Sequence, residues 1–425
     1  EATGVHLSSP AMRSIIPLHD DAVIPFYKEL SDALRPHGMK ILQQIYHPGS
    51  ARAPGKGTFQ ISASAIPNPI AGGIPTAMTI PMIEEMIEAF ASAARRCRDG
   101  GLDGIDIHAS SGYLIEQFLS PANNIRTDRY GGSLENRMRF LMEIIEAIRE
   151  EVGTDICVGI RLPNEEYIPG GLTAADNAEI AKIVEPHVDY ISLHMGSYWR
   201  FHKLLSPMDD PLGHEMPANE PIIKQITKPT IVVGRIMTLD HADTIVSEGQ
   251  ADMVSMVRAL IADPGLVNKA RQGNTDQIRP CIGSNFGCVG QIMSTGKLGC
   301  VVNIAAAQET EVTFEPEGKP KAIEKILIVG GGPAGLEAAR TAAIMGHEVH
   351  LHEATKHLGG QVRIAATAPS RSDIGSITKW LESEMERLKI NVTLNSLVDP
   401  DIVEELNPDR IILATGSTPR KDGFQ

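Results

Sequence analysis

Residues 104–162 read GIDIHASSGYLIEQFLSPANNIRTDRYGGSLENRMRFLMEIIEAIREEVGTDICVGIRL. This stretch opens and closes on short apolar runs, at 104–109 and 156–162, which are typical of strands buried on both faces. Between them, residues 134–152 place apolar side chains at helical spacing, and Ser133 stands where an N-cap is expected. A strand, a long helix and a second strand predict one parallel β-α-β unit.

The same alternation continues on both sides of this unit. We expect a helix over residues 80–96, and further strands at 39–47, 190–195, 230–236 and 252–258. Six such units in series, without a topological break, favour a (β/α)8 TIM barrel over a doubly wound α/β sheet. The first strands of the barrel are missing from the pattern, and Glu1–Val5 is expected to be the tail of the second strand.

The composition is that of a globular protein. Of the 425 residues, 42% are hydrophobic and 22% charged, and the length suggests about three domains. The formal net charge of −14 argues against nucleic-acid binding. No apolar run is long enough for a membrane span. Five cysteines are too few for a disulfide scaffold in a chain of this size. We therefore expect a cytoplasmic protein with a small-molecule substrate and no nucleic-acid or membrane partner, and homo-oligomerisation is left open. Because the chain starts at Glu1 rather than Met, we expect a fragment at both ends.

Three regions follow one another along the chain. Residues 1–275 form the predicted barrel domain, with strands 3–8 of the eight. Residues 276–323 contain three of the five cysteines and end in a polar, proline-bearing linker. Residues 324–425 begin a second α/β pattern, for which we expect a truncated Rossmann-like domain that binds FAD or NAD(P).

A glycine-rich turn lies between the first strand and the first helix of this last region. The strand Lys325–Val329 runs into Gly330-Gly-Gly332-Pro-Ala-Gly335, and Glu353 ends the next strand. The glycines allow a tight turn and a close approach of the backbone to a pyrophosphate, and the acid can accept hydrogen bonds from ribose hydroxyls. We therefore expect Gly330, Gly332, Gly335 and Glu353 to bind a dinucleotide.

Two later segments resemble the FAD domain of the disulfide-reductase-like flavoproteins, namely Leu358-Gly-Gly-Gln361 and Ile411-Ile-Leu-Ala-Thr-Gly416. The resemblance implies that FAD is the cofactor and that Gln361 lies in its binding site. In those flavoproteins an NAD(P)H domain is inserted after the Ala-Thr-Gly turn. The resemblance therefore also implies a nicotinamide site mostly outside these 425 residues.

The barrel carries a long and specific motif. His108-Ala-Ser-Ser-Gly-Tyr-Leu-Ile-Glu-Gln-Phe-Leu-Ser-Pro121 is followed by Arg126-Thr-Asp-Arg-Tyr-Gly-Gly-Ser133 and by Glu135-Asn-Arg137. With these segments the chain resembles the old yellow enzyme family over nearly its whole length, and most of all the multidomain branch that includes 2,4-dienoyl-CoA reductase and trimethylamine dehydrogenase. The resemblance implies FMN in the barrel, FAD in the C-terminal domain, a [4Fe–4S] cluster and NAD(P)H as co-substrate.

The predicted FMN site lies at strand ends, because barrel enzymes place their active sites there. The resemblance implies that Gln44 hydrogen-bonds the flavin pyrimidine and that Arg161 stabilises the anionic reduced flavin. The loops after the last two strands are the usual phosphate site of such barrels, and the arginine fork binds phosphate well. The residues expected to hold the FMN phosphate are Gly234, Arg235, Val257 and Arg258.

His108 and Tyr113 are the predicted catalytic residues. The resemblance implies that His108 holds a substrate carbonyl oxygen and that Tyr113 donates a proton to the substrate carbon opposite the hydride. A phenol can act as a general acid where its anion is stabilised. Simpler family members have a second His, or an Asn, where this chain has Ser111.

Three cysteines nearly match the family's [4Fe–4S] motif. Cys281, Cys288 and Cys300 are the expected ligands, and Ser284 stands at the position of the fourth Cys. Iron–sulfur clusters prefer four thiolates, and a serine oxygen is a harder ligand for iron. Three outcomes stay open: a cluster with Ser284 or water at the fourth iron, a three-iron cluster, or no cluster.

The resulting hypothesis is an oxidoreductase with three redox centres. NAD(P)H reduces FAD, the cluster passes single electrons, and FMN in the barrel reduces an activated C=C bond of an enoyl or enone substrate. The alternative is an amine dehydrogenase or N-demethylase of the trimethylamine dehydrogenase type, with which the missing second His is compatible. A third hypothesis, suggested by Ser284 and Val257, is a flavin-binding subunit without turnover.

Overall fold

The computed structural model of the chain describes residues 2–9, 16–51, 60–316, 318, 320–418 and 423. The chain is divided into two compact units. The first unit comprises residues 1–206 and 211–255, and the second comprises residues 207–210 and 256–425. The predicted domain boundaries at residues 275 and 323 stay predictions.

A parallel sheet builds the first unit. Its strands are hydrogen-bonded in the order β1-β2-β5-β6-β7-β8-β9, which is the strand order of a (β/α)8 barrel, here with seven strands in the described residues. The strand at Ala2–Gly4 pairs with Gln44–Tyr46, as expected for the tail of the second barrel strand. The seven strands are β1 (Ala2–Gly4), β2 (Leu42–Tyr46), β5 (Gly104–His108), β6 (Cys157–Pro163), β7 (Tyr190–His194), β8 (Thr230–Val232) and β9 (Met253–Val254), and a separate pair consists of β3 (Ile61–Ser62) and β4 (Thr76–Ala77).

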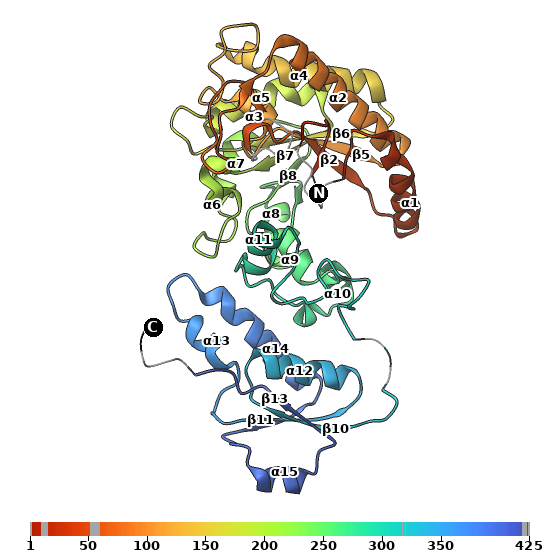
Figure 1. Ribbon diagram of the computed structural model, residues 1–425, viewed down its shortest axis with the longest axis vertical. Helices are drawn as coiled ribbons and strands as arrows, with labels where there is room; N and C mark the ends of the chain where they lie inside the picture. Colours follow the sequence, from red (N-terminus) through yellow and green to blue (C-terminus); the bar gives the residue numbers. More distant parts are fainter. Residues whose placement is uncertain are drawn as a thin grey trace. The chain divides into compact units, whose positions relative to one another are not determined.

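Helices cover the outer side of this sheet, with α2 and α4 lying along it (Figure 1). Side chains alternate along a strand, so Ile105 and Ile107 of β5 join the fully buried core, whereas Asp106 and His108 face the opposite side, the inside of the barrel. The helices of the unit are α1 (Ile24–Leu34), α2 (Ile80–Asp99), α3 (Leu114–Leu119), α4 (Leu134–Val152), α5 (Ala174–Val184), α6 (Phe201–Leu204), α7 (Met216–Ile223) and α8 (Leu239–Ser247).

The strands predicted at 230–236 and 252–258 are shorter in the structure, since β8 ends at Val232 and β9 at Val254. The backbone leaves the extended region at Gly234 and Arg235, whose φ angles are 126° and 52°. Val257 begins a helix of the second unit instead of ending a strand. A short apolar run does not by itself distinguish a strand from the first turn of a helix, which explains both errors.

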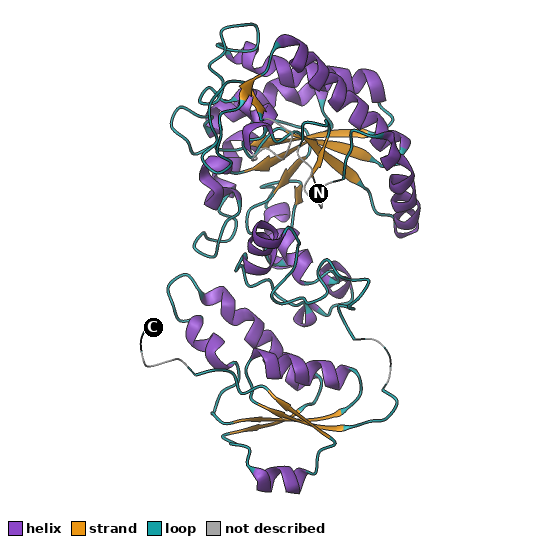
Figure 2. Ribbon diagram, in the orientation of Figure 1, coloured by secondary structure: helices purple, strands orange, loops and turns teal. Residues whose placement is uncertain are grey.

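The second unit contains a four-stranded parallel sheet in the order β12-β11-β10-β13. Helices α12 and α14 pack on one face of this sheet and α15 lies on its other side (Figure 2). This is the predicted Rossmann-like arrangement of strand, glycine-rich turn and helix. The strands are β10 (Lys325–Val329), β11 (Glu348–Glu353), β12 (Asn391–Leu394) and β13 (Arg410–Leu413), and the helices are α9 (Val257–Ala262), α10 (Leu266–Arg271), α11 (Gln291–Thr295), α12 (Pro333–Ile344), α13 (Gly360–Ala365), α14 (Ser376–Arg387) and α15 (Pro400–Leu406).

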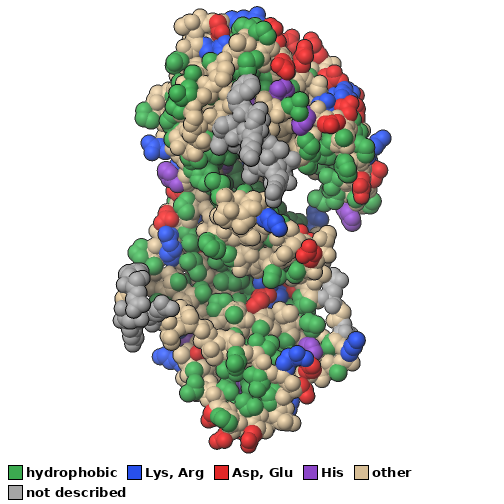
Figure 3. Space-filling view, viewed as in Figure 1, with side chains coloured by type: hydrophobic (Ala, Val, Ile, Leu, Met, Phe, Trp, Pro, Cys, Tyr) green, Lys and Arg blue, Asp and Glu red, His purple; other side chains and the backbone are tan. Residues whose placement is uncertain are grey.

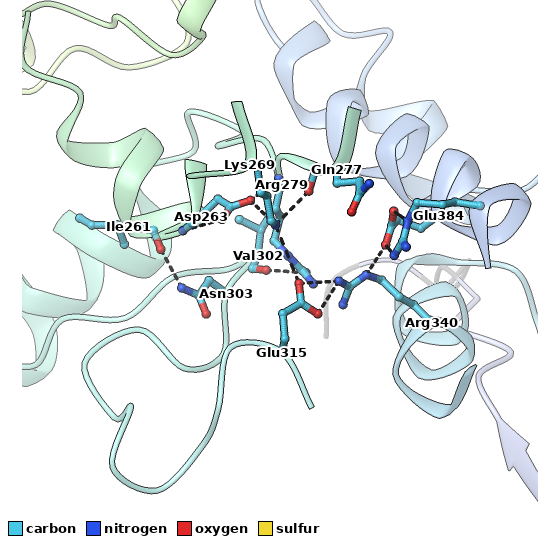
Figure 4. A network of polar contacts seen from close by, with 12 residues as sticks. Ile261, Asp263, Lys269, Gln277, Arg279, Val302, Asn303, Glu315, Arg340 and Glu384 are labelled. Atoms are coloured by element: carbon cyan, nitrogen blue, oxygen red, sulfur yellow. Dashed lines mark hydrogen bonds and ion pairs between the residues drawn. The ribbon is translucent and has the colours of Figure 1, made fainter. Parts of the chain in front are cut away.

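A network of polar contacts joins the cysteine-bearing segment to the Rossmann-like helices (Figure 4). Arg279 donates a hydrogen bond of 2.7 Å to the carbonyl oxygen of Val302. Arg340 of α12, which is only 2% exposed, donates to Glu384 of α14 at 2.8 Å and to Glu315 at 2.6 Å. Buried guanidinium groups require such partners, so the network fixes the segment against this sheet.

Charged side chains of both signs are interspersed over the face drawn in Figure 3. Over the whole sequence, 53 acidic residues exceed 39 basic ones. Within the part of the chain that the structure describes, no helix has both the length and the apolarity needed to cross a membrane.

Candidate active site

Polar side chains line the inside of the barrel where the strands end. In the strand register His108 of β5 pairs with Arg161 of β6, which pairs with Ser192 of β7. Arg161 Nε donates to Ser192 Oγ at 3.4 Å. The two residues predicted at neighbouring strand ends, His108 and Arg161, are therefore brought together at one level of the barrel.

His108 is a neutral hydrogen-bond donor in this arrangement. Its side chain is buried, and the backbone N–H of Ser110 donates to His108 Nδ1 at 3.4 Å. Because Nδ1 accepts, the ring proton is assigned to Nε2. Burial lowers the pKa of His108 well below its usual value, and electrostatic interactions with Arg161 and with His194 lower it further.

A strained turn positions Tyr113. Ser111 and Gly112 have φ angles of 66° and 76°, a conformation that is costly for serine. Two buried side chains of α3 hold the turn: Glu116 Oε2 accepts from Gly112 N at 2.5 Å, and Gln117 Nε2 donates to Gly112 O at 2.7 Å. Tyr113 is the N-cap residue of α3, so the turn fixes the backbone position from which its side chain extends.

Aromatic rings surround the Tyr113 side chain. Its ring centroid lies 4.8 Å from that of His108 and 4.8 Å from that of Tyr46. Its hydroxyl lies 3.2 Å from the hydroxyl of Tyr198, so one phenol donates to the other. The sequence did not single out Tyr46, because an aromatic residue within an apolar strand is typical of a core position.

Gln44 of β2 pairs in the strand register with Asp106, which precedes His108 by two residues on β5. Gln44 Nε2 donates a hydrogen bond to Asp106 Oδ2 at 2.6 Å. Tyr190 donates to the other carboxylate oxygen of Asp106 at 3.1 Å. Asp106 was not among the site residues predicted from the sequence. The sequence feature that could have identified Asp106 is an acidic side chain two residues before His108, on the same face of an otherwise apolar strand.

Gly234 and Arg235 form a tight turn after β8. A Cβ on Gly234 would lie 2.7 Å from Glu215 Cγ, so only glycine fits against that buried side chain. Val257 and Arg258 begin α9 in the second unit, where Arg258 donates to Asn285 Oδ1 at 2.7 Å. That Val257 and Arg258 hold the FMN phosphate together with Gly234 and Arg235 stays a prediction.

The glycine-rich turn of the second unit is tightly packed at two of its glycines and open at the third. A Cβ on Gly335 would lie 1.9 Å from the carbonyl oxygen of Gly330, and a Cβ on Gly330 would lie 2.4 Å from that of Ala414. A Cβ on Gly332, the N-cap of α12, would meet no atom within 4 Å. The open position leaves the first N–H groups of α12 accessible to an anion.

Glu353 and Gln361 lie near this turn. Glu353 accepts hydrogen bonds from Gly331 N at 2.7 Å and from Thr355 N at 2.9 Å. Burial raises the pKa of Glu353, but these hydrogen bonds outweigh burial and hold the pKa below its usual value. Gln361 Nε2 donates to the carbonyl oxygen of Ser417, which follows the segment predicted to flank the FAD.

The three predicted cluster ligands are free thiols in the second unit. Gly283 N donates weakly to Cys281 Sγ at 3.5 Å, and a Cβ on Gly287 would lie 2.9 Å from Cys300 Cα, so the loop before Cys288 approaches Cys300 closely. Burial raises the pKa of the Cys281 thiol. The described residues contain no group of three or more His, Cys, Asp or Glu side chains placed to hold a metal ion.

Comparison with known proteins identifies the family. Residues 1–277 match the NADH:flavin oxidoreductase / NADH oxidase family, which is well over half of the chain. The chain belongs to this family. Residues 301–399 and 324–424 match the pyridine nucleotide-disulphide oxidoreductases, in agreement with the Rossmann-like fold of the second unit.

Two curated relatives and one solved structure illustrate this NADH:flavin oxidoreductase branch. The NADH oxidase of Thermoanaerobacter brockii is 40% identical, over 95% of this chain and 62% of its own length. The multifunctional alkene reductase/demethylase of Caballeronia cordobensis is 36% identical, over 100% of this chain and 62% of its own length. A 2-naphthoyl-CoA reductase complex is 31% identical with a TM-score of 0.91, over 99% of this chain and 66% of that one. The chain thus spans about three fifths of the length of these curated relatives.

The barrel of this NADH:flavin oxidoreductase fits a flavin mononucleotide. Arg161 offers a cation and Gln44 an amide on the inner face of the barrel strands, and the turn after β8 offers the Arg235 guanidinium and the backbone of Gly234. A flavin needs these elements: a positive charge for its reduced form, a hydrogen-bonding group at its pyrimidine edge and a phosphate turn. The three cysteines, by contrast, do not form the ligand set of a cluster in the described residues.

The open glycine of the second unit gives a testable prediction. Replacing Gly332 by Ala should leave the fold intact, at a cost of about 1 kcal/mol or less for a weaker N-cap, because its Cβ meets open space. FAD affinity should fall at least tenfold, since the pyrophosphate must approach the backbone there. Calorimetric FAD titration of the deflavinated full-length protein measures this effect.

Gly335→Ala is the matched control for Gly332→Ala. The Cβ that this substitution adds overlaps the carbonyl oxygen of Gly330 and should lower the free energy of unfolding by about 1–3 kcal/mol through overpacking. A Gly332→Ala protein that binds FAD as tightly as the unsubstituted protein contradicts the assignment of this turn to the pyrophosphate.

The buried pair of Glu116 and Glu166 gives a prediction about pH. Both side chains are fully buried, and burial, followed by the charge of Glu166, raises the pKa of Glu116 well above its usual value. The folded protein therefore retains a proton that the unfolded chain releases above about pH 4.3, so its free energy of unfolding falls as pH rises between the unfolded and folded pKa values. Glu116→Gln should remove this fall, up to about 1.4 kcal/mol per pH unit.

Urea denaturation of Glu116→Gln and of the unsubstituted protein between pH 5 and about pH 8 measures this difference. The exposed Glu135→Gln provides the control, and its stability should follow that of the unsubstituted protein at every pH. Parallel curves for Glu116→Gln and the unsubstituted protein contradict a proton held by this pair.

Proposed function

We propose that the full-length protein reduces an activated C=C bond of an enoyl or enone substrate with electrons from NAD(P)H. The observation that carries the proposal is the pairing of Tyr113 with His108, whose ring centroids lie 4.8 Å apart. This pairing sets a phenol O–H, which can donate a proton to carbon, beside a neutral imidazole N–H, which can hold a carbonyl oxygen.

Each side chain of the site then has one task. His108 Nε2–H holds the substrate carbonyl oxygen and draws electron density from the conjugated C=C bond. FMN, when bound, supplies the hydride that adds to the β-carbon. Tyr113 gives its proton to the α-carbon, so the C=C bond gains one hydride and one proton. Tyr198, at 3.2 Å from the phenol oxygen, stabilises the phenolate that remains.

NAD(P)H oxidation by the purified full-length protein tests this proposal. Enones, enoyl thioesters and cinnamate-type acids are the substrates to screen, with detection of the saturated product. We expect substrate-dependent oxidation of NAD(P)H and one saturated product per NAD(P)H consumed. Absence of turnover with all three substrate classes contradicts the proposal.

An amine dehydrogenase or N-demethylase is the second candidate function. The ring cluster of Tyr46, Tyr113 and Tyr198 favours it, because aromatic faces attract alkylammonium groups. Serine at position 111 removes the second carbonyl donor that simple enone reductases use. Incubation with methylated amines and an artificial electron acceptor tests this function, and acceptor reduction without any enone turnover favours it over alkene reduction.

The proposal also includes FAD at the glycine-rich turn of the second unit and NAD(P)H as the electron source. The open Gly332 position and the ionised Glu353 support FAD there. An iron–sulfur cluster on Cys281, Cys288 and Cys300 stays a prediction from their resemblance to the family's cluster motif. Quantitation of FMN, FAD, iron and acid-labile sulfide in the full-length protein decides which of these groups are present.

A further inference from the structure

Asp106 is the central residue of a polar level inside the barrel. In the strand register, Gln44 of β2 pairs with Asp106 of β5, Asp106 with Gly159 of β6, and Gly159 with Tyr190 of β7. This level lies two residues below the level of His108 and Arg161. The inward-facing side chains of such barrels stack in layers. The Asp106 carboxylate therefore lies in the layer next to that of His108 and Arg161.

Two hydrogen bonds and one charge converge on the Asp106 carboxylate. Gln44 Nε2 donates to Oδ2 at 2.6 Å, and the Tyr190 hydroxyl donates to Oδ1 at 3.1 Å. Burial raises the pKa of Asp106, whereas Arg161, Gln44 and Tyr190 all favour its ionised form. Each carboxylate oxygen thus has its own donor, and a nearby guanidinium balances the charge.

Gly159 makes the contact from Tyr190 possible. A Cβ at this position would lie 2.0 Å from Tyr190 Cζ, so the tyrosine ring occupies the space where any other residue would place its side chain. The ring can therefore cross β6 from β7 and reach Asp106 on β5. The arrangement depends on residue choice at three strands, unlike a chance contact between neighbouring surface groups.

The carboxylate decides which end of the Gln44 amide faces it. Both oxygens of the Asp106 side chain accept hydrogen bonds, and Gln44 presents its NH2 group to one of them. The amide oxygen, Gln44 Oε1, then remains to accept a hydrogen bond from a ligand. Without Asp106, the amide can turn around and offer either end.

We propose that Asp106 is a positioning residue for the flavin: it fixes the Gln44 amide so that Oε1 accepts from the ring N3–H at the pyrimidine edge. The Tyr190 hydroxyl, which reaches across Gly159, binds the other oxygen of Asp106. The inference rests on the FMN site within the proposed function but not on the identity of the substrate. Asp106 itself need not touch the flavin.

A labelled cofactor tests this inference in the unsubstituted protein. The full-length protein is deflavinated and reconstituted with ¹⁵N-labelled FMN, and the N3–H resonance is followed by NMR. We expect a downfield N3–H proton that exchanges slowly with water, as an oriented hydrogen bond requires. An N3–H resonance at the position of free FMN overturns the proposal, and this readout needs no variant to fold.

A double-mutant cycle tests whether Asp106 acts through Gln44. Asp106→Asn should weaken FMN binding about five- to tenfold, which corresponds to the loss of one oriented hydrogen bond. In a Gln44→Ala background, Asp106→Asn should have no further effect on FMN affinity. Equal losses in both backgrounds overturn the proposal.

Tyr190→Phe is the matched control, because it removes one hydrogen bond of Asp106 and leaves the contact with Gln44. Its FMN affinity should fall less than that of Asp106→Asn, and its N3–H resonance should keep the downfield position. The outcomes also separate the inference from the proposed function. FMN binding without coupling between Asp106 and Gln44 overturns the inference alone, whereas failure to bind FMN in the barrel overturns both.

Discussion

Tyr113→Phe should lower the rate of alkene reduction by about 10²- to 10⁴-fold, the usual contribution of a positioned general acid. Phenylalanine keeps the ring contacts with His108 and Tyr46 but has no proton to give. The reduction of the enzyme by NAD(P)H does not use this proton, so its rate should stay within about twofold. Stopped-flow measurement of the two half-reactions separates these effects.

Tyr198→Phe serves as the graded control for Tyr113→Phe. It removes the hydroxyl 3.2 Å from the Tyr113 oxygen while leaving the acid itself in place. The loss should be about tenfold, equivalent to one hydrogen bond to a developing charge. Alkene reduction at the full rate in Tyr113→Phe contradicts the role given to this residue, and amine oxidation unaffected by the same change supports the second candidate function.

Arg340→Met should produce the largest loss of stability in the second unit. Arg340 is 2% exposed, donates to Glu384 and Glu315, and stacks with its guanidinium carbon 4.9 Å from the ring centroid of Trp380. Glu384 is itself only 1% exposed. Removing one partner of a buried ion pair leaves an under-compensated charge and costs about 3–5 kcal/mol, and the remaining contact with Arg387 places the expected loss near the lower end.

Tryptophan fluorescence during urea denaturation measures this loss. The chain has two tryptophans, and a Trp199→Phe background leaves Trp380 as the reporter of the second unit. The control is Arg410→Met, which removes an exposed ion pair with Glu324 and should change the midpoint little. Equal midpoint shifts for Arg340→Met and Arg410→Met contradict the stabilising role of the buried network.

The long periodic elements were predictable from sequence, and the short ones were not. The helix expected at 134–152 has those bounds, and the Ser133 side chain accepts from Asn136 N as an N-cap should. The capping residue, the apolar face and the terminal glycine all agree there. Around 230–258 the strands are two or three residues long, and tertiary packing rather than local pattern decides where they stop.

The candidate site was predictable where function lies at a strand end. His108 and Arg161 were expected separately, and the parallel register places them opposite each other. Asp106 was missed because its contacts join strands far apart in the sequence, and Tyr46 was missed because an aromatic residue within an apolar strand is typical of a core position. The role of Asp106 in particular depends on Gly159 being small enough for Tyr190 to cross, a relation that no single segment of the sequence contains.

Anaerobic single-turnover absorbance tests directly whether the barrel flavin and Tyr113 together reduce an activated alkene. The full-length protein is reduced with NAD(P)H and then mixed with an enone or enoyl thioester. We expect the oxidised-flavin spectrum to return at a rate that rises with substrate concentration and falls sharply in Tyr113→Phe, with one saturated product per barrel flavin. A flavin that stays reduced with every such substrate, but is readily reduced from its oxidised form by methylated amines, would contradict it.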